Sequence, residues 1–154
     1  MKRYLNWIEF NSYGCEWEKA YFDKFSGGFI VINKQRIAHS KLSKNEKAKF
    51  DKELDMSMVF AKRGYKIELL EEIPRIPSPD VKINGTLADL KRVSGHNNIV
   101  KNAKEAINKQ GAKVVLFEIG ENTKKVQEEL DKLKRMGIKI HYYFIDNKNE
   151  IRSL

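Results

Sequence analysis

A chain of 154 residues with 41% hydrophobic residues and three prolines has the size and composition of one globular domain, not of an extended disordered protein. The formal net charge of +9 favours a polyanionic partner, and we expect nucleic acid rather than a membrane. No apolar run approaches the roughly 20 residues of a membrane span, and no signal-peptide core is present, so we expect a soluble, cytoplasmic protein. The single Cys15 excludes an internal disulfide and a multi-cysteine zinc site.

The first 42 residues are interpreted as an amino-terminal elaboration of the same domain. Trp17, Tyr21 and Phe25 recur every four residues before Gly27 and Gly28, which predicts a short helix over residues 16–25. Residues 29–32 are predicted to form a strand, and residues 36–39 to pair with it across a turn. The aromatic side chains of this segment lie among lysines and arginines, where they either pack a core or stack nucleic-acid bases.

A helix is predicted from Ser43 to about residue 63. Ser43 and Glu46 form a capping box at its start, and Gly64 is a left-handed stop. Glu53 is expected beside the apolar stripe of this helix, which we assign to Phe50, Leu54, Met58 and Ala61. A strand over residues 65–70 follows. Residues 71–79 contain all three prolines and are expected to form an extended connector.

Asn84 and Gly85, between two short alternating apolar runs, predict a β-hairpin with a two-residue type I′ turn. This register places Asp80 opposite Asp89, with Lys91 next along the same face. Opposed carboxylates repel, and a hard divalent ion such as Mg²⁺ or Mn²⁺ would compensate them. The other face, toward the core, is assigned to Val81, Ile83, Ala88 and Leu90. A solvated face of alternating charges remains the alternative, and a register slip of one residue would separate the carboxylates.

The remaining elements alternate between helices and strands. A polar loop leads to a helix over residues 99–110, whose amino terminus favours anions, and Gly111 ends it. A strand over residues 112–119, a charged helix over 123–136 and a strand over 138–145 follow, with a hydrophilic end at 146–154. The order of helix, three strands, helix, strand, helix and strand predicts an α/β fold with a mixed β-sheet flanked by helices.

Asp80 after Pro79, followed by Asp89-Leu90-Lys91, resembles the PD-(D/E)XK signature of restriction-endonuclease-like nucleases. The predicted order over residues 43–145 is similar to the α-β-β-β-α-β core of that family, so we assign residues 43–154 to such a core. The resemblance implies metal-dependent hydrolysis of phosphodiester bonds in RNA or DNA. It implies that Asp80 and Asp89 hold Mg²⁺ or Mn²⁺, that Glu53 completes the metal shell, and that Lys91 orients the nucleophile. Phosphate contacts are expected from Lys82, Arg92, Lys101 and Lys104.

A narrower resemblance extends past the signature. The hairpin, the segment Ser94-Gly95-His96-Asn97-Asn98-Ile99 and a helix with Ala106-x-x-x-Gln110 resemble carboxy-terminal nuclease domains of bacterial contact-dependent and polymorphic toxins, several of which cut tRNA. Similar segments also occur at the ends of phage-type proteins. The resemblance implies that Ser94, His96, Asn97 and Gln110 lie near the substrate and that a cognate immunity or inhibitor protein is a partner.

Other interpretations fit parts of the same sequence. His39 beside Ser40 and Lys41 suits a metal-independent ribonuclease that uses histidine as general acid or base. A basic nucleic-acid-binding module without catalysis and a structural component of a phage or mobile element are further alternatives. Glu53 is alternatively a solvated partner of a nearby lysine.

Overall fold

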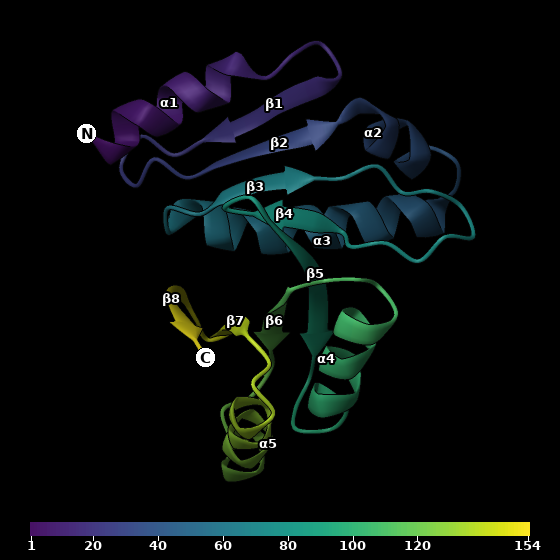
Figure 1. The fold of residues 1–154 in the computed structure, drawn as a ribbon, viewed down its shortest axis with the longest axis vertical. Helices are drawn as coiled ribbons and strands as arrows, with labels where there is room; N and C mark the ends of the chain where they lie inside the picture. Colours follow the sequence, from purple (N-terminus) through teal and green to yellow (C-terminus); the bar gives the residue numbers. More distant parts are fainter. The chain divides into compact units, whose positions relative to one another are not determined.

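The computed structural model describes residues 1–154 and divides them into two compact units. The first unit contains residues 1–75 and 80–85, and the second contains residues 76–79 and 86–154. Each unit has four strands in mixed parallel and antiparallel pairing, with helices packed on them (Figure 1). The predicted α/β fold with mixed sheet and flanking helices is confirmed. None of the helices has both the length and the apolar character that crossing a membrane requires.

The first unit is built around the buried strand β2. Its elements are α1 (Lys2–Ser12), β1 (Trp17–Phe22), β2 (Phe29–Asn33), α2 (Lys34–Ser40), α3 (Lys44–Lys62), β3 (Lys66–Leu69) and β4 (Val81–Ile83). Strand β2 is antiparallel to β1 and parallel to β3, and β3 is antiparallel to β4. Helix α3 packs against β2 and β3, and α1 packs against β1 and β2.

The second unit has a central strand that is buried along its whole length. Its elements are β5 (Thr86–Val93), α4 (Ile99–Asn108), β6 (Val114–Ile119), α5 (Lys124–Arg135), β7 (Ile140–Phe144) and β8 (Asn147–Ser153). Strands β5, β6 and β7 are parallel, and β8 is antiparallel to β7. Every residue of β6 is buried, as its continuous apolar run predicts. The apolar faces of α4 and α5 share one core with β6 and β7.

Two predictions in the amino-terminal part are wrong. Residues 17–22 form strand β1 instead of a helix, and residues 34–40 form helix α2 instead of a strand. In β1, Trp17 and Phe22 pack against a core of Phe10, Phe29 and Val31. These aromatic side chains therefore pack from a strand, a structure that aromatic residues also favour. Helix α2 starts at Asn33, whose side chain accepts a hydrogen bond from the backbone N–H of Gln35. Helix α1 and strand β8 were not predicted.

Helix α3 confirms its predicted ends but turns a different face inward. The hydroxyl of Ser43 accepts a hydrogen bond from the backbone N–H of Glu46 at 3.1 Å, and Gly64 has a φ of 96°. Leu54 and Met58 are only partly buried, so the predicted stripe is wrong at these two positions. The buried residues of the helix are Phe50, Glu53, Met56, Ser57, Phe60 and Ala61. Glu53 therefore lies within the inward face, not beside it.

The turn between β4 and β5 has the predicted local geometry. Asn84 and Gly85 have φ values of 48° and 83°, and a type I′ turn requires positive φ at both positions. The four side chains predicted to face a core are buried: Val81, Ile83, Ala88 and Leu90. The order α3, β3, β4, β5, α4, β6, α5, β7 agrees with the predicted order. The predicted boundary between residues 42 and 43 stays a prediction.

Gly28 is expected to tolerate no side chain. A Cβ there would lie 2.7 Å from the carbonyl carbon of Ala61 and closer still to its oxygen, because β2 begins against the last turn of α3. We expect Gly28→Ala to lower the free energy of unfolding in urea by about 3 kcal/mol, the cost of overpacking against backbone. Gly95→Ala is the matched control, because a Cβ at Gly95 meets no atom within 4 Å. Its expected change is under about 0.5 kcal/mol, and equal losses in both variants would contradict this account.

Candidate functional site

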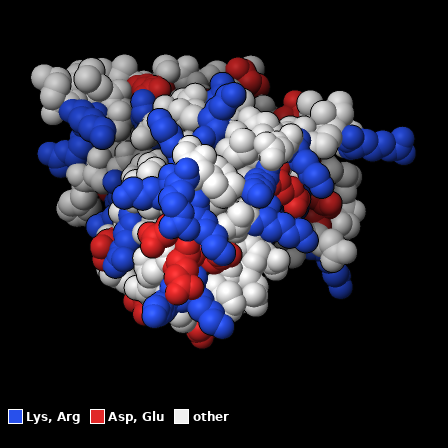
Figure 2. Space-filling model, turned by 60° about the horizontal axis from the view of Figure 1, so that its bottom comes forward, with Lys and Arg blue, Asp and Glu red and all other residues white.

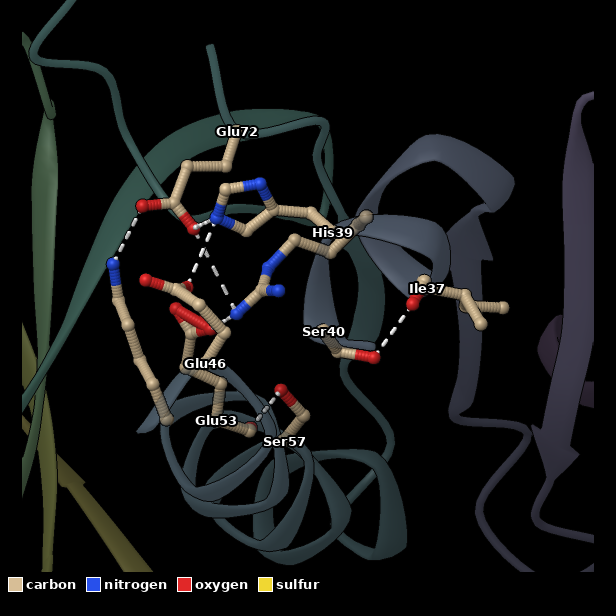
Figure 3. A network of polar contacts seen from close by, with 9 residues as sticks. Ile37, His39, Ser40, Glu46, Glu53, Ser57 and Glu72 are labelled. Atoms are coloured by element: carbon tan, nitrogen blue, oxygen red, sulfur yellow. Dashed lines mark hydrogen bonds and ion pairs between the residues drawn. The ribbon is translucent and has the colours of Figure 1, made fainter. Parts of the chain in front are cut away.

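Charged side chains from three segments of the first unit meet in one cluster, which we call the α2–α3 network (Figure 3). The segments are α2, α3 and the connector that follows β3. The members of the network are Arg36, His39, Glu46, Lys49, Glu53 and Glu72. In sequence these residues are spread over 37 positions, and no short motif joins them.

Glu53 is held by a buried arginine. Its Oε2 lies 2.6 Å from Nη2 of Arg36, and the two side chains are 5% and 3% exposed. The guanidinium of Arg36 also lies over the ring of Phe50, at 5.1 Å from the ring centroid. The alternative of a solvated carboxylate paired with lysine is therefore wrong for Glu53. Its negative charge is compensated within the protein, which a buried carboxylate requires.

Glu72 and Lys49 form a second ion pair of the network. The ammonium of Lys49 lies 2.8 Å from Oε1 of Glu72. Burial favours the neutral form of Lys49, but the hydrogen bond and charge of Glu72, with the charges of Glu53 and Asp80, raise its pKa. Burial likewise opposes ionisation of Glu72, yet Lys49, Arg36 and His39 lower its pKa. Glu53 and Asp80, two of the predicted metal ligands, are thus both within electrostatic reach of Lys49.

His39 directs one ring nitrogen to two carboxylates. Its Nε2 lies 2.9 Å from Oε2 of Glu46 and 3.5 Å from Oε2 of Glu72 (Figure 3). The hydroxyl of Ser40 donates instead to the backbone oxygen of Ile37 at 2.6 Å, and Lys41 is exposed. The three consecutive residues proposed for a metal-independent ribonuclease therefore do not form one polar cluster. The sequence pattern missed Glu46 and Glu72 as partners of His39, because they come from other segments.

The second unit carries Asp89 and Lys91 on β5. Asp89 is 3% exposed, and its Oδ2 lies 3.1 Å from Nζ of Lys91. The two residues are two positions apart on one strand, so their side chains leave the same face. The pair thus joins an almost fully buried carboxylate to a partly exposed ammonium group, and its catalytic role stays a prediction.

Arg92, which is exposed, pairs with the buried carboxylate of Glu118, a contact that the sequence did not indicate. Its Nε lies 2.8 Å from Oε1 of Glu118 on β6, and the hydroxyl of Tyr143 on β7 donates to Oε2 of Glu118 at 2.7 Å. Side chains alternate between the two faces of a strand, and Arg92 lies three positions after Asp89. The two side chains therefore leave opposite faces of β5. It therefore has an internal carboxylate partner, and its predicted contact with phosphate stays a prediction.

The other predicted substrate-binding residues lie in several places. Lys82 is opposite Glu68 in the β3–β4 ladder. Ser94, His96 and Asn97 lie in the loop between β5 and α4, and Gln110 follows the last turn of α4. Asn98 begins α4 in a left-handed conformation with a φ of 70° and without a side-chain cap. Lys101 and Lys104 are exposed on α4.

The predicted metal ligands belong to different compact units. Glu53 and Asp80 lie in the first unit, whereas Asp89 and Lys91 lie in the second. The opposition of Asp80 and Asp89 and their joint binding of a metal ion stay predictions. The structure brings together Glu53 with Arg36 and Asp89 with Lys91.

Positive charge is widespread on the surface. Figure 2 shows lysine and arginine side chains over much of one face, with acidic side chains among them. The sequence has 30 Lys and Arg against 21 Asp and Glu. A surface of this kind attracts a polyanion through many separate contacts, which weaken together as salt is added.

Comparison with known proteins points to bacterial toxins. Residues 77–151 match the family model of the contact-dependent growth inhibition CdiA C-terminal domain. The chain is also similar to a solved structure described as the CdiA-CT/CdiI toxin and immunity complex from Burkholderia pseudomallei, with a TM-score of 0.51 and 17% sequence identity. The similarity covers 67% of this chain and 81% of that chain. No curated protein matches the chain. The family match supports the resemblance to contact-dependent toxin domains, and the similar solved structure agrees with the α/β fold, while neither tests the PD-(D/E)XK signature.

Proposed function

We propose that this chain is a toxic endonuclease domain that hydrolyses phosphodiester bonds of nucleic acid with the help of a divalent metal ion. The observation that carries the proposal is the pair Asp89 and Lys91 on β5, a buried carboxylate 3.1 Å from a lysine ammonium. Both residues lie within the segment 77–151 that is similar to toxin domains. The substrate class is RNA, such as tRNA, or DNA.

The residues of the signature fit a hard cation by their chemistry. Asp80 and Asp89 offer the carboxylate oxygens that Mg²⁺ and Mn²⁺ prefer, and we assign the metal to them. The carboxylate of Glu53 forms an ion pair with Arg36 at 2.6 Å. We therefore assign Glu53 a supporting role in the metal shell. When bound, the ion supplies charge neutralisation at the phosphate and a more acidic water.

Lys91 is assigned the orientation of the nucleophile. Its ammonium is held by Asp89 and its side chain is 19% exposed, so it is both fixed and accessible to a phosphate. In the proposed reaction an oxygen of water forms a bond to phosphorus and the bond from phosphorus to the leaving oxygen breaks. The attacking water gives one proton to the solvent, and the leaving oxygen takes one from it to become a hydroxyl. A positive charge placed at Lys91 favours the negative charge that builds up on the phosphate.

The partners and location follow from the same proposal. Lys82, Arg92, Lys101 and Lys104 are proposed to contact phosphates, with Ser94, His96, Asn97 and Gln110 near the substrate. A cognate immunity protein is proposed as a second partner, because the similar solved structure is a toxin and immunity complex. The proposed site of action is the bacterial cytoplasm, where nucleic acid is accessible.

The test is cleavage of total tRNA and of plasmid DNA by the purified chain with Mg²⁺, with Mn²⁺ and with EDTA. We expect cutting of one substrate with either metal and none with EDTA, because the carboxylates alone cannot neutralise a phosphate. Cutting that persists in EDTA would contradict the metal-dependent reaction and favour acid–base chemistry at His39. Salt-sensitive binding without cutting would favour a binding module, and neither binding nor cutting would favour a structural component.

A further inference from the structure

The α2–α3 network contains a set of metal-ligand atoms that the proposed nuclease reaction does not use. These atoms are Nε2 of His39, one oxygen of Glu46 and one oxygen of Glu72, and they all lie within 4.8 Å of one another. They come from α2, from the first turn of α3 and from the connector after β3. Figure 3 shows one imidazole nitrogen in contact with both carboxylates.

Two of these atoms lack the hydrogen-bond donors that buried oxygens normally have. Oε2 of Glu46 and Oε2 of Glu72 are buried and accept no hydrogen bond. Both approach Nε2 of His39, at 2.9 and 3.5 Å. One ring nitrogen carries at most one proton, and it cannot donate to both oxygens with good geometry. The cluster therefore gathers potential ligand atoms from three side chains within 4.8 Å of one another.

The two distances from the imidazole nitrogen to the carboxylate oxygens suit a small divalent ion. Metal bonds of about 2.0–2.1 Å place neighbouring ligand atoms about 2.9 Å apart at right angles and about 3.4 Å apart at tetrahedral angles. The two measured distances from Nε2, 2.9 and 3.5 Å, lie close to these values. An imidazole with two carboxylates suits Zn²⁺ and related transition metals, whereas Mg²⁺ prefers oxygen ligands alone.

The charge of the surroundings also favours a cation. The guanidinium of Arg36 and the ammonium of Lys49 are the neighbouring cations. The neighbouring carboxylates are Glu46, Glu53, Glu72 and Asp80. The carboxylates of Glu46, Glu53 and Glu72 outnumber these two cations, so a bound cation would offset the excess negative charge of the group.

We propose that His39, Glu46 and Glu72 form a binding site for one divalent transition-metal ion of the Zn²⁺ type, separate from the Mg²⁺ or Mn²⁺ site assigned to Asp80 and Asp89. The ion ties the connector after β3, residues 71–79, to α2 and α3 through Glu72. This connector has three prolines and no regular secondary structure. A bound metal ion would therefore restrict a segment that forms no strand or helix of its own.

The test is titration of the metal-free full chain with Zn²⁺ by calorimetry and with Co²⁺ by visible absorption, which reports the coordination geometry. We expect one equivalent to bind and to raise the melting temperature. Affinity should fall on the order of tenfold or more in His39→Gln and in Glu46→Gln. Glu46→Gln keeps the Ser43 cap, because the cap uses the backbone N–H of residue 46.

Two controls separate this site from the rest of the molecule. His141→Gln removes a histidine whose Nδ1 lies 2.6 Å from the hydroxyl of Ser153, in the second unit, and Asp89→Asn alters the proposed catalytic site. Both variants should bind Zn²⁺ as the unaltered chain does. Unchanged binding in folded His39→Gln, loss of binding in Asp89→Asn, or absence of binding to the unaltered chain would each overturn the proposal. Because the readout is metal binding, failure of the nuclease proposal leaves the result interpretable.

Discussion

Asp89→Asn should abolish cleavage while leaving the fold intact. We expect a loss on the order of 1,000-fold or more in the cleavage rate, because asparagine has the shape of aspartate without the charge that fixes Lys91 and attracts a cation. Asp89 is nearly buried and lies 3.1 Å from the lysine ammonium. The measurement is single-turnover cleavage in Mg²⁺ at saturating protein, with nucleic-acid binding measured in parallel.

The control for this variant is Asp131→Asn, which makes the same chemical change on the exposed surface of α5. It should cut at the rate of the unaltered chain. Binding of nucleic acid should survive in both variants, since the proposed phosphate contacts use other side chains. An Asp89→Asn protein that is folded and cuts at the normal rate with normal metal dependence would remove Asp89 from the proposed site.

Arg36→Met should destabilise the protein more than any surface charge change. We expect the free energy of unfolding in urea to fall by about 3–5 kcal/mol, because the variant leaves the carboxylate of Glu53 buried without its cation. The two side chains are 3% and 5% exposed, and Nη2 lies 2.6 Å from Oε2. The double variant Arg36→Met with Glu53→Leu should recover most of the loss, since two apolar side chains leave no uncompensated charge.

The chain offers a matched control for burial. Lys47 and Asp51 on α3 form an ion pair with the same separation, 2.6 Å, but their side chains are 58% and 50% exposed. Lys47→Met should therefore cost less than about 1 kcal/mol. Two outcomes would show that burial does not set the contribution of the Arg36–Glu53 pair to stability. One is a similar loss of unfolding free energy in Lys47→Met and Arg36→Met, and the other is a double variant no more stable than Arg36→Met alone.

Local sequence signals determined the elements from α3 to β7. Ser43 caps α3, Asn84 and Gly85 make the turn before β5, and the all-apolar β6 is buried throughout. Each of these features acts within a few residues, through a hydrogen bond, a positive φ or a pattern of apolar side chains. For the same reason Asp89 and Lys91 were found, because two positions on one strand suffice to place them on one face.

Sequence patterns failed where a partner far along the chain decides the local structure. The spacing of Trp17, Tyr21 and Phe25 suggests a helix, but pairing with β2 makes this segment a strand. Strand β8 has no apolar alternation and exists because its backbone pairs with β7. Helix α1 exposes Tyr4, Leu5 and Ile8 and so lacks a clean apolar stripe.

By itself, then, the sequence determined the order of elements from α3 to β7 and the turn between β4 and β5. Only the tertiary structure decided that Glu53 is buried against Arg36 and that His39 meets Glu46 and Glu72. Those contacts join residues up to 33 positions apart, from His39 to Glu72, with no periodic signal between them. The physical reason is that a buried charge pairs with whichever opposite charge the packing of the helices brings close to it. That packing depends on the whole core.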